Sequence, residues 1–400
     1  MKKTFKFFML IFSIMLLSGC FNYKEINNYA IVSGISIDLD DEDPSKYVVG
    51  IQIMNAKKDE ESDNSLITFY KTKGKTIYQA LEKIMLDSPK ELYLGHNEVV
   101  VINEELAKEK DPLDYLDYFM RDSEVEKDAL IMIAKENKAY EILKIITPLE
   151  TIPSRNLKST LAVADNFSGT LTVVTIDEFI SDLIENGKQP VAPTITITGD
   201  VNDGEKMENI AESDPESKLK FDTLAYFQDN RLKGYLSNEE SIGYNFLSGE
   251  EKETYVNVKC DSENYATMRV INSKIDQKLS FKNGKPYVKI TTKINANLLE
   301  YNCRADFIES EKYVKELQKK YAKKIEQIMK KATNKLYIEN KADVLDYGDK
   351  FYKKKYSEMK KYNYKKEEIV NDISFKFDVN VEIKSTELTI KSVKGASSYD

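Results

Sequence analysis

The chain has 400 residues, 41% of them hydrophobic and 32% charged, and its 67 acidic residues outnumber its 59 lysines and arginines, giving a formal net charge of −8. This acidic balance argues against a nucleic-acid partner, and a single histidine excludes a multi-histidine metal site. The length predicts two or three domains, each large enough for its own core.

The first predicted element is an export signal over residues 1–19. Lysines 2, 3 and 6 precede an apolar stretch, Phe7 to Leu17, which is too short to span a bilayer because a spanning helix takes about 20 apolar residues. The segment ends in Leu17-Ser18-Gly19-Cys20, which resembles the lipobox of bacterial lipoproteins. On this interpretation the mature chain begins at Cys20, whose acyl chains hold it on membrane lipid. A plain secretory signal with an incidental cysteine is the alternative.

Strands and helices then alternate as far as Thr198. Helix starts are predicted at Thr76, followed by Gln79, and at Thr175, followed by Glu178, because both pairs have capping-box spacing. The alternation predicts a mixed sheet packed with helices, in an N-terminal α+β domain over residues 20–198. The predicted strands are Tyr29–Asp38, Tyr47–Met54, Glu98–Asn103, Ala129–Ala134 and Val191–Thr198, and the predicted helices begin at Ile77, Pro112, Ala139 and Ile176.

The composition changes at residues 199–218. This stretch contains glycine, proline and many acidic residues but almost no large apolar ones. Such a composition is typical of a linker, so an acidic linker and a domain boundary are predicted there.

The second half, residues 219–395, is predicted to be a C-terminal α+β domain with an antiparallel sheet and a long amphipathic helix. Asn283-Gly284 lies between two long alternating runs and is the strongest hairpin signal in the chain. Apolar residues recur at helical spacing from Glu309 to Ile338, with lysines elsewhere. The other predicted strands are Leu219–Phe227, Arg231–Leu236, Ser374–Lys384 and Leu388–Val393, and the other predicted helices are Ser237–Leu247 and Val344–Lys360. The fold class is therefore α+β.

Two cysteines remain besides Cys20. Cys260 and Cys303 both lie in a stretch of predicted strands, and an exported chain permits their oxidation. They form a disulfide only if their Cα atoms come within about 7 Å, which spacing along the sequence does not decide. Two cysteines are too few for a disulfide framework, and their neighbours do not suit a metal site.

No catalytic motif or cofactor fingerprint emerges. His96 has no nucleophile motif near it, so a structural hydrogen-bonding role is predicted. The acidic pairs Asp40-Asp41 and Glu60-Glu61 are predicted to be solvated turn residues. Gly74-Lys75-Thr76 lacks the first glycine of a phosphate-binding loop. The chain is therefore predicted not to be an enzyme and to need no cofactor.

Tyrosine is abundant, with 25 residues against no tryptophan, and five tyrosines cluster among lysines near the C-terminus. Tyrosines in such a setting are either anchors of a protein contact or caps on a core with the hydroxyl in water. We treat these five as a hypothetical partner surface: Tyr347, Tyr352, Tyr356, Tyr362 and Tyr364.

The order of several motifs resembles the C-subunit lipoproteins of bacterial spore nutrient-germinant receptors. The likeness begins at Cys20-Phe21-Asn22-Tyr23-Lys24-Glu25-Ile26, although Phe21-Asn22 stands where Trp-Asp is common, and it continues to the closing segment. The usual tryptophans near Met359 are absent. The other similar motifs are Ala30 to Asp38, Gly74 to Ile77, Ser88 to His96, Arg121-Asp122, Pro148 to Glu150, Ile152-Pro153-Ser154, Asp343 to Gly348, Tyr352, Lys355-Tyr356 and Val379 to Val381.

The resemblance implies a noncatalytic subunit anchored on the outer face of the spore's inner membrane. Its implied partners are the integral membrane A- and B-type receptor subunits, and its implied role is assembly of a receptor that triggers germination in response to nutrients. The family's three-part fold also implies that the second half divides again near residues 299–308. The alternatives are a solute-binding lipoprotein of a membrane transporter, with a ligand closed between two bodies, and, ranked last, an exported enzyme.

Overall fold

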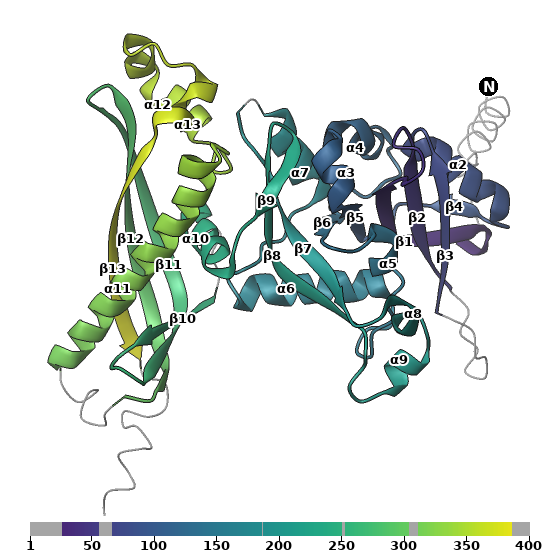
Figure 1. Cartoon of the computed structure of the whole chain (residues 1–400), viewed down its shortest axis with the longest axis horizontal. Helices are drawn as coiled ribbons and strands as arrows, with labels where there is room; N and C mark the ends of the chain where they lie inside the picture. The colour runs from purple at the N-terminus through teal and green to yellow at the C-terminus, as the bar shows by residue number, and fades with distance from the viewer. Residues whose placement is uncertain (1–25, 56–65, 186, 250–252, 304–310, 386–400) are drawn as a thin grey trace, which may run out of the picture.

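The computed structural model describes residues 26–55, 66–185, 187–249, 253–303 and 311–385. These residues form two bodies, one built on a nine-stranded sheet and the other on a four-stranded sheet (Figure 1). The predicted α+β class is confirmed. The predicted signal peptide, Cys20, Glu60-Glu61 and the predicted strand Leu388–Val393 lie outside the described residues.

The first sheet is parallel at its centre and antiparallel at both flanks. Strands β1, β5, β6 and β7 run parallel, while β2 and β3 extend one flank and β8 and β9 the other. The central strands β5 and β6 are buried at every position, because their apolar residues face helices on both sides. The strands are β1 (Tyr29–Leu39), β2 (Tyr47–Met54), β3 (Ile67–Gly74), β4 (Glu91–Tyr93), β5 (Val99–Asn103), β6 (Leu130–Ala134), β7 (Val191–Thr198), β8 (Lys218–Gln228) and β9 (Arg231–Tyr235).

Helices cover both faces of this sheet. The core on one face includes residues of α2 (Ile77–Asp87), α3 (Glu104–Glu109), α4 (Pro112–Arg121) and α7 (Ile176–Ile184), and the core on the other includes residues of α5 (Ala139–Ile142) and α6 (Pro153–Phe167). The predicted caps are confirmed, since Thr76 Oγ1 accepts from Gln79 N at 3.1 Å and Thr175 forms a capping box with Glu178. No helix in the described ranges combines the length and the apolar character needed to cross a membrane.

The sheet continues across the predicted acidic linker, which corrects that prediction. Residues 199–218 contain the short helices α8 (Val201–Gly204) and α9 (Glu208–Ala211), held by Asn209, whose Nδ2 donates to Ile146 O and Ser217 O at 2.9 and 3.0 Å. Strand β8 then pairs with β7, and β9 pairs with β8, so both extend the first sheet instead of opening the second. The change from one sheet to the other comes after β9. The boundary lies later in the chain than predicted because β8 pairs with β7 across the predicted linker. Composition does not reveal this pairing.

The second body packs a long helix on a sheet with a long hairpin. The hairpin turns at Asn283 and Gly284, both with positive φ, as predicted. Strands β10, β11 and β12 are antiparallel, but β13 joins β12 in parallel, so the predicted antiparallel sheet is mixed at that side. The elements are α10 (Asn238–Ser248), β10 (Thr254–Lys259), β11 (Tyr265–Lys282), β12 (Lys285–Tyr301), α11 (Glu311–Thr333), the π-helix η3 (Asn334–Glu339), α12 (Tyr347–Lys361), η4 (Lys366–Glu368), α13 (Ile369–Asp372) and β13 (Ser374–Ser385).

Strand β13 is the outer strand of its sheet within the described residues, and its side chains alternate sharply. Phe377 and Val381 are buried against the core, whereas a polar or charged residue is exposed at every second position. These exposed residues are Lys376, Asp378, Asn380, Glu382 and Lys384.

Helix α10 joins the two bodies. Asn245, which is 4% exposed, donates from Nδ2 to the carbonyls of Gly169 and Leu171, both at 2.9 Å, and both acceptors belong to the first body. The core of the second body also includes Leu224 and Tyr226 of β8. The junction is therefore packed as well as hydrogen-bonded.

Candidate functional site

The start of α12 is fixed by a buried carboxylate. Asp343, which is 4% exposed, accepts through Oδ1 from the Tyr337 hydroxyl at 3.0 Å and the Tyr347 amide at 2.8 Å, and through Oδ2 from the Gly348 amide at 2.7 Å. These bonds satisfy amides that a helix start leaves open. Burial nevertheless raises the pKa of Asp343. A Cβ at Gly348 would lie 2.7 Å from the Lys366 carbonyl oxygen, so this position has no room for a side chain.

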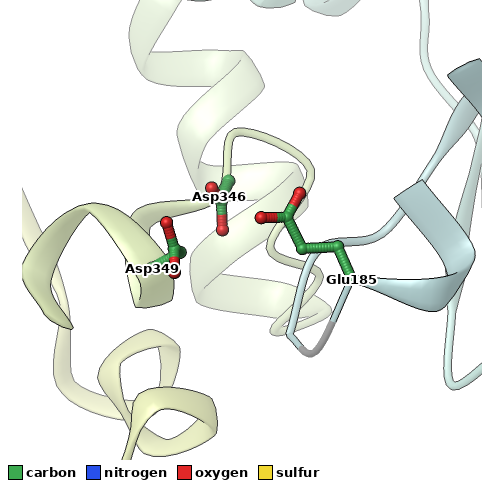
Figure 2. A group of neighbouring side chains, drawn as sticks. All are labelled: Glu185, Asp346 and Asp349. Carbon is green, nitrogen blue, oxygen red and sulfur yellow. The ribbon is translucent and has the colours of Figure 1, made fainter. Parts of the chain in front are cut away.

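Three carboxylates meet where α12 faces the first body. Glu185, which follows α7, points toward Asp346 and Asp349 at the start of α12, and one oxygen of each lies within 4.8 Å of the others (Figure 2). Asp346 has a left-handed backbone, φ 56°, and its buried Oδ1 has no hydrogen-bond partner among the described residues. Burial, and then the charge of Glu185, raise the pKa of Asp346 to about 6.

Lysines already neutralise part of this acidic cluster. Asp349 lies 2.5 Å from Lys353 Nζ and 3.0 Å from Lys366 Nζ, and the bond to Lys353 lowers the pKa of Asp349. Carboxylates at this spacing are able to ligate a divalent cation, but one of the three is taken by two ammonium groups. The cluster is therefore an ion-pair network at the junction, and we assign no metal to it.

The five tyrosines of the hypothetical partner surface do not share one environment. Tyr347 is fully buried and makes edge contact with Tyr337, the ring centroids being 5.4 Å apart, so its assignment to a surface is wrong. Tyr364 is half-buried and donates from its hydroxyl to Asp372 at 2.9 Å. Tyr352, Tyr356 and Tyr362 are 49%, 53% and 39% exposed. Only these three are available for a contact.

Cys260 follows β10, and Cys303 follows β12. The structure joins them in a disulfide, with Cα atoms 6.2 Å apart, inside the range such a bond requires. The bridge connects the residue after β10 to a residue just after the end of β12. Cys20, the predicted lipidation site, lies outside the described residues.

A cavity of about 310 Å³ lies at the end of β1 in the first body. Asp38 is 1% exposed there and accepts from the amides of Ala139 and Tyr140 at 2.6 and 3.1 Å, and its burial raises its pKa to about 7. Several of the other charges around the cavity form ion pairs: Lys73 Nζ lies 2.9 Å from Asp40 and 2.8 Å from Glu42. The cavity lies inside one body, whereas the solute-binding alternative would close on its ligand between two.

Other predicted residues differ in part from expectation. Asp40 is 3% exposed, so only Asp41 of that pair is a solvated turn residue. The side chain of His96 is 49% exposed, and its Nε2 lies 3.8 Å from Glu98 Oε1, which is longer than a hydrogen bond. Among the described residues the His96 side chain therefore has no hydrogen-bond partner, so its predicted hydrogen-bonding role has no support there. Gly74 is buried beside the start of α2, where a Cβ would lie 2.6 Å from the Ala80 amide nitrogen.

Two of the buried polar residues that were not identified from the sequence hold distant segments of the chain together. One is Asp38, and the other is Gln52 in β2, whose Nε2 donates to Leu143 O at 2.5 Å and whose Oε1 accepts from Ser33 Oγ at 3.0 Å and from the Ser154 amide at 3.2 Å. Gln52 thus satisfies the first turn of α6 from a distant strand. The available signal was a lone polar residue inside an apolar run.

Two protein-family models match the chain in order. The family described as "Spore germination protein N-terminal domain" matches residues 22–197, and the family described as "Spore germination B3/ GerAC like, C-terminal" matches residues 222–387. The gap between the two matches, residues 198–221, includes the predicted linker at 199–218, although the sheet runs across it.

Individual proteins are similar along most of the chain. Spore germination protein KC of Bacillus subtilis (strain 168) is 30% identical over 359 residues, which cover 86% of each chain. Spore germination protein B3 of the same strain is 23% identical over 386 residues, covering 96% of this chain and 98% of that protein. The crystal structure of the GerBC protein has a TM-score of 0.56 at 20% identity and covers 88% of this chain and 97% of its own. This last likeness supports the fold.

Proposed function

This chain belongs to the GerAC-like family of spore germination proteins, and from that membership we propose that it is the lipid-anchored C subunit of a nutrient-germinant receptor. The observation that carries the proposal is the match of both family models, in order, from residue 22 to residue 387. The predicted lipobox ends at Cys20, two positions before the first matched residue. The proposed location is the outer face of the spore's inner membrane.

The proposed role is assembly and not catalysis. The integral A- and B-type subunits would hold the receptor in the bilayer, and this chain would contribute two bodies outside it. The packed junction supports a fixed orientation of the bodies, because Asn245 and Leu224 connect them by hydrogen bonding and by burial. An assembly subunit with fixed geometry presents the same surfaces to its partners each time.

The anchor is tested with Cys20→Ala in the organism that makes the protein. The variant is expected to fold but to leave the membrane fraction, and spores carrying it are expected to germinate poorly in nutrients. Ser18→Ala is the matched control, because it keeps a small residue in the lipobox and leaves the thiol in place. The comparison is made without the integral subunits and after a high-salt wash, which remove attachments that do not depend on the anchor. If Cys20→Ala then stays in the membrane fraction as fully as Ser18→Ala, the proposed anchor is wrong.

Assembly is tested separately by affinity capture of the tagged chain from spore membranes. Two integral membrane proteins of germinant-receptor type are expected to be captured with it. Capture of the subunits of a solute transporter would instead favour the solute-binding alternative. Capture of neither class would contradict the proposed role in assembly.

A further inference from the structure

One segment of this acidic chain is strongly basic. Residues 350–366, which contain most of α12 and the turn after it, hold eight lysines and one glutamate. The side chains of Lys354, Lys360 and Lys361 are exposed, and among the described residues they have no ion-pair partner. These three lysines therefore carry positive charge that no carboxylate among the described residues neutralises.

Aromatic rings project from the same helix among these lysines. Tyr352 and Tyr356 are four residues apart, about half exposed, and in edge contact with ring centroids 5.2 Å apart. The opposite side of the helix is packed, since Phe351 and Met359 are buried. The helix is thus amphipathic in an unusual way, because its outer face carries both charge and aromatic area.

The tip of the β11–β12 hairpin extends this surface. Tyr362 stacks on Phe281 with centroids 5.2 Å apart, and Gly284 at the turn lies against the Tyr362 ring. Lys282 at the tip is exposed. The hairpin and α12 therefore form one continuous edge, which lies at the upper end of the second body in Figure 1.

We propose that this edge, made of the outer face of α12 and Tyr362, is a second membrane contact that lies on anionic lipid headgroups. Clustered lysines are attracted to anionic leaflets, and tyrosine favours the boundary between headgroups and acyl chains. A protein partner fits less well, because lysine is depleted at the cores of protein interfaces. The inference rests on the proposed function for its biological setting, but the physical contact does not require the lipid anchor.

The position of the edge suits a chain tethered at its other end. In Figure 1, β4, which pairs with the first residues of β1, lies toward the same upper side as α12, at the opposite end of the long axis. Cys20 precedes Ile26 by six residues, which span at most ~20 Å. A tether at the first body and a basic edge on the second would give two attachments to one surface. The acidic remainder of the chain would be repelled from the same leaflet.

The test measures partitioning of the full chain carrying Cys20→Ala into vesicles, so that a failure of the anchor does not affect the result. The variant K354E/K360E/K361E is compared with K312E/K319E/K323E, which makes the same change of net charge at exposed lysines of α11. With about one-third phosphatidylglycerol, the α12 variant is expected to partition on the order of 100-fold more weakly than the parent, and the α11 variant much less so. In neutral phosphatidylcholine the difference should vanish, and added salt should reduce it.

The aromatic contribution is measured with Y352A/Y356A in the same vesicles, where weaker partitioning at unchanged charge is expected. Equal losses for the α11 and α12 variants would mean that only net charge matters and would overturn the proposal. Unchanged vesicle binding of the α12 variant, combined with failure to capture integral subunits from spore membranes, would assign the edge to a protein partner instead. Circular dichroism of each variant establishes that the fold is retained.

Discussion

The backbone amide of Gln189 donates a hydrogen bond to the carbonyl of Asp343 across 3.1 Å, and so links the first body to the second. Gln189 lies between α7 and β7, while Asp343 lies just before α12. The same aspartate uses its carboxylate to hold the first turn of α12. One residue therefore sets both the start of the helix and its attachment to the neighbouring body.

Replacing Asp343 with alanine should lower the free energy of unfolding by about 2 to 4 kcal/mol, because the Tyr337 hydroxyl and two amides lose their acceptor inside the protein. Urea denaturation measures the loss. Asp378→Ala is the control: that carboxylate is exposed, 3.6 Å from Lys289, and its removal should cost less than about 1 kcal/mol. Similar losses in the two variants would show that Asp343 does not organise the start of α12.

Stability should fall as pH rises from about 5 to 8. The folded-state pKa values of Asp346 and Asp38, about 6 and about 7, lie above the ordinary aspartate value of 3.8. The folded state therefore binds more protons than the unfolded state in this window. The stabilisation is complete at low pH and is lost as pH rises through the folded-state values.

Asp346→Asn should flatten this pH dependence and stabilise the protein by about 1 to 2 kcal/mol at pH 8, a value reduced for partial exposure of the side chain. Urea denaturation at several pH values gives the slope. Asp378→Asn, at an exposed site, should leave the slope unchanged. If Asp346→Asn keeps the parent slope, the carboxylate at the junction does not carry the predicted proton.

Reducing the Cys260–Cys303 disulfide should lower the melting temperature. The bridge closes a separation of 43 residues, for which the loss of unfolded-state entropy corresponds to about 3 to 4 kcal/mol. Mass spectrometry of an unreduced digest should find the two cysteine peptides joined. Alkylation of both thiols without a reductant would contradict the bridge in the protein as isolated.

Tyr347 and Tyr356 should respond oppositely to substitution. Tyr347→Ala should cost about 3 to 5 kcal/mol because the ring is fully buried, and Tyr356→Ala should cost less than about 0.5 kcal/mol because its side chain is exposed. Tyr347→Phe should be neutral or stabilising, since the buried hydroxyl has no hydrogen-bond partner within the part of the chain that the structure describes. Thermal unfolding of the three variants measures these changes in stability. A large loss of stability in Tyr347→Phe would indicate that the Tyr347 hydroxyl is hydrogen-bonded.

Features with a local cause were predictable from the sequence. The caps at Thr76 and Thr175 and the turn at Asn283-Gly284 each depend on residues within four positions, and the structure contains all three. Helix α6 was not predicted, because Ile152 offers it no side-chain cap. The Ser154 amide is instead satisfied by Gln52, which lies 102 positions away in the chain. No window of sequence contains that partner.

The same distinction explains the outcome for the tyrosines. Positions 347 and 352 differ by five residues, which places them well apart around a helix with 3.6 residues per turn. Tyr347 shares its side with Phe351, and Tyr352 shares its side with Tyr356, so the prediction of one surface containing all five tyrosines overlooked the helical spacing. Which face is buried depends on Tyr337 and Phe375, and these reach Tyr347 only through the tertiary fold.

The alternation along β13 has a consequence for crowding. Lipoproteins held on a bilayer meet one another at a high two-dimensional density, where an open row of backbone donors and acceptors invites strands of neighbouring copies to add. Such an addition would desolvate four exposed charged residues of β13: Lys376, Asp378, Glu382 and Lys384. Within the described residues, β13 can therefore be the outer strand of its sheet without pairing with neighbouring copies.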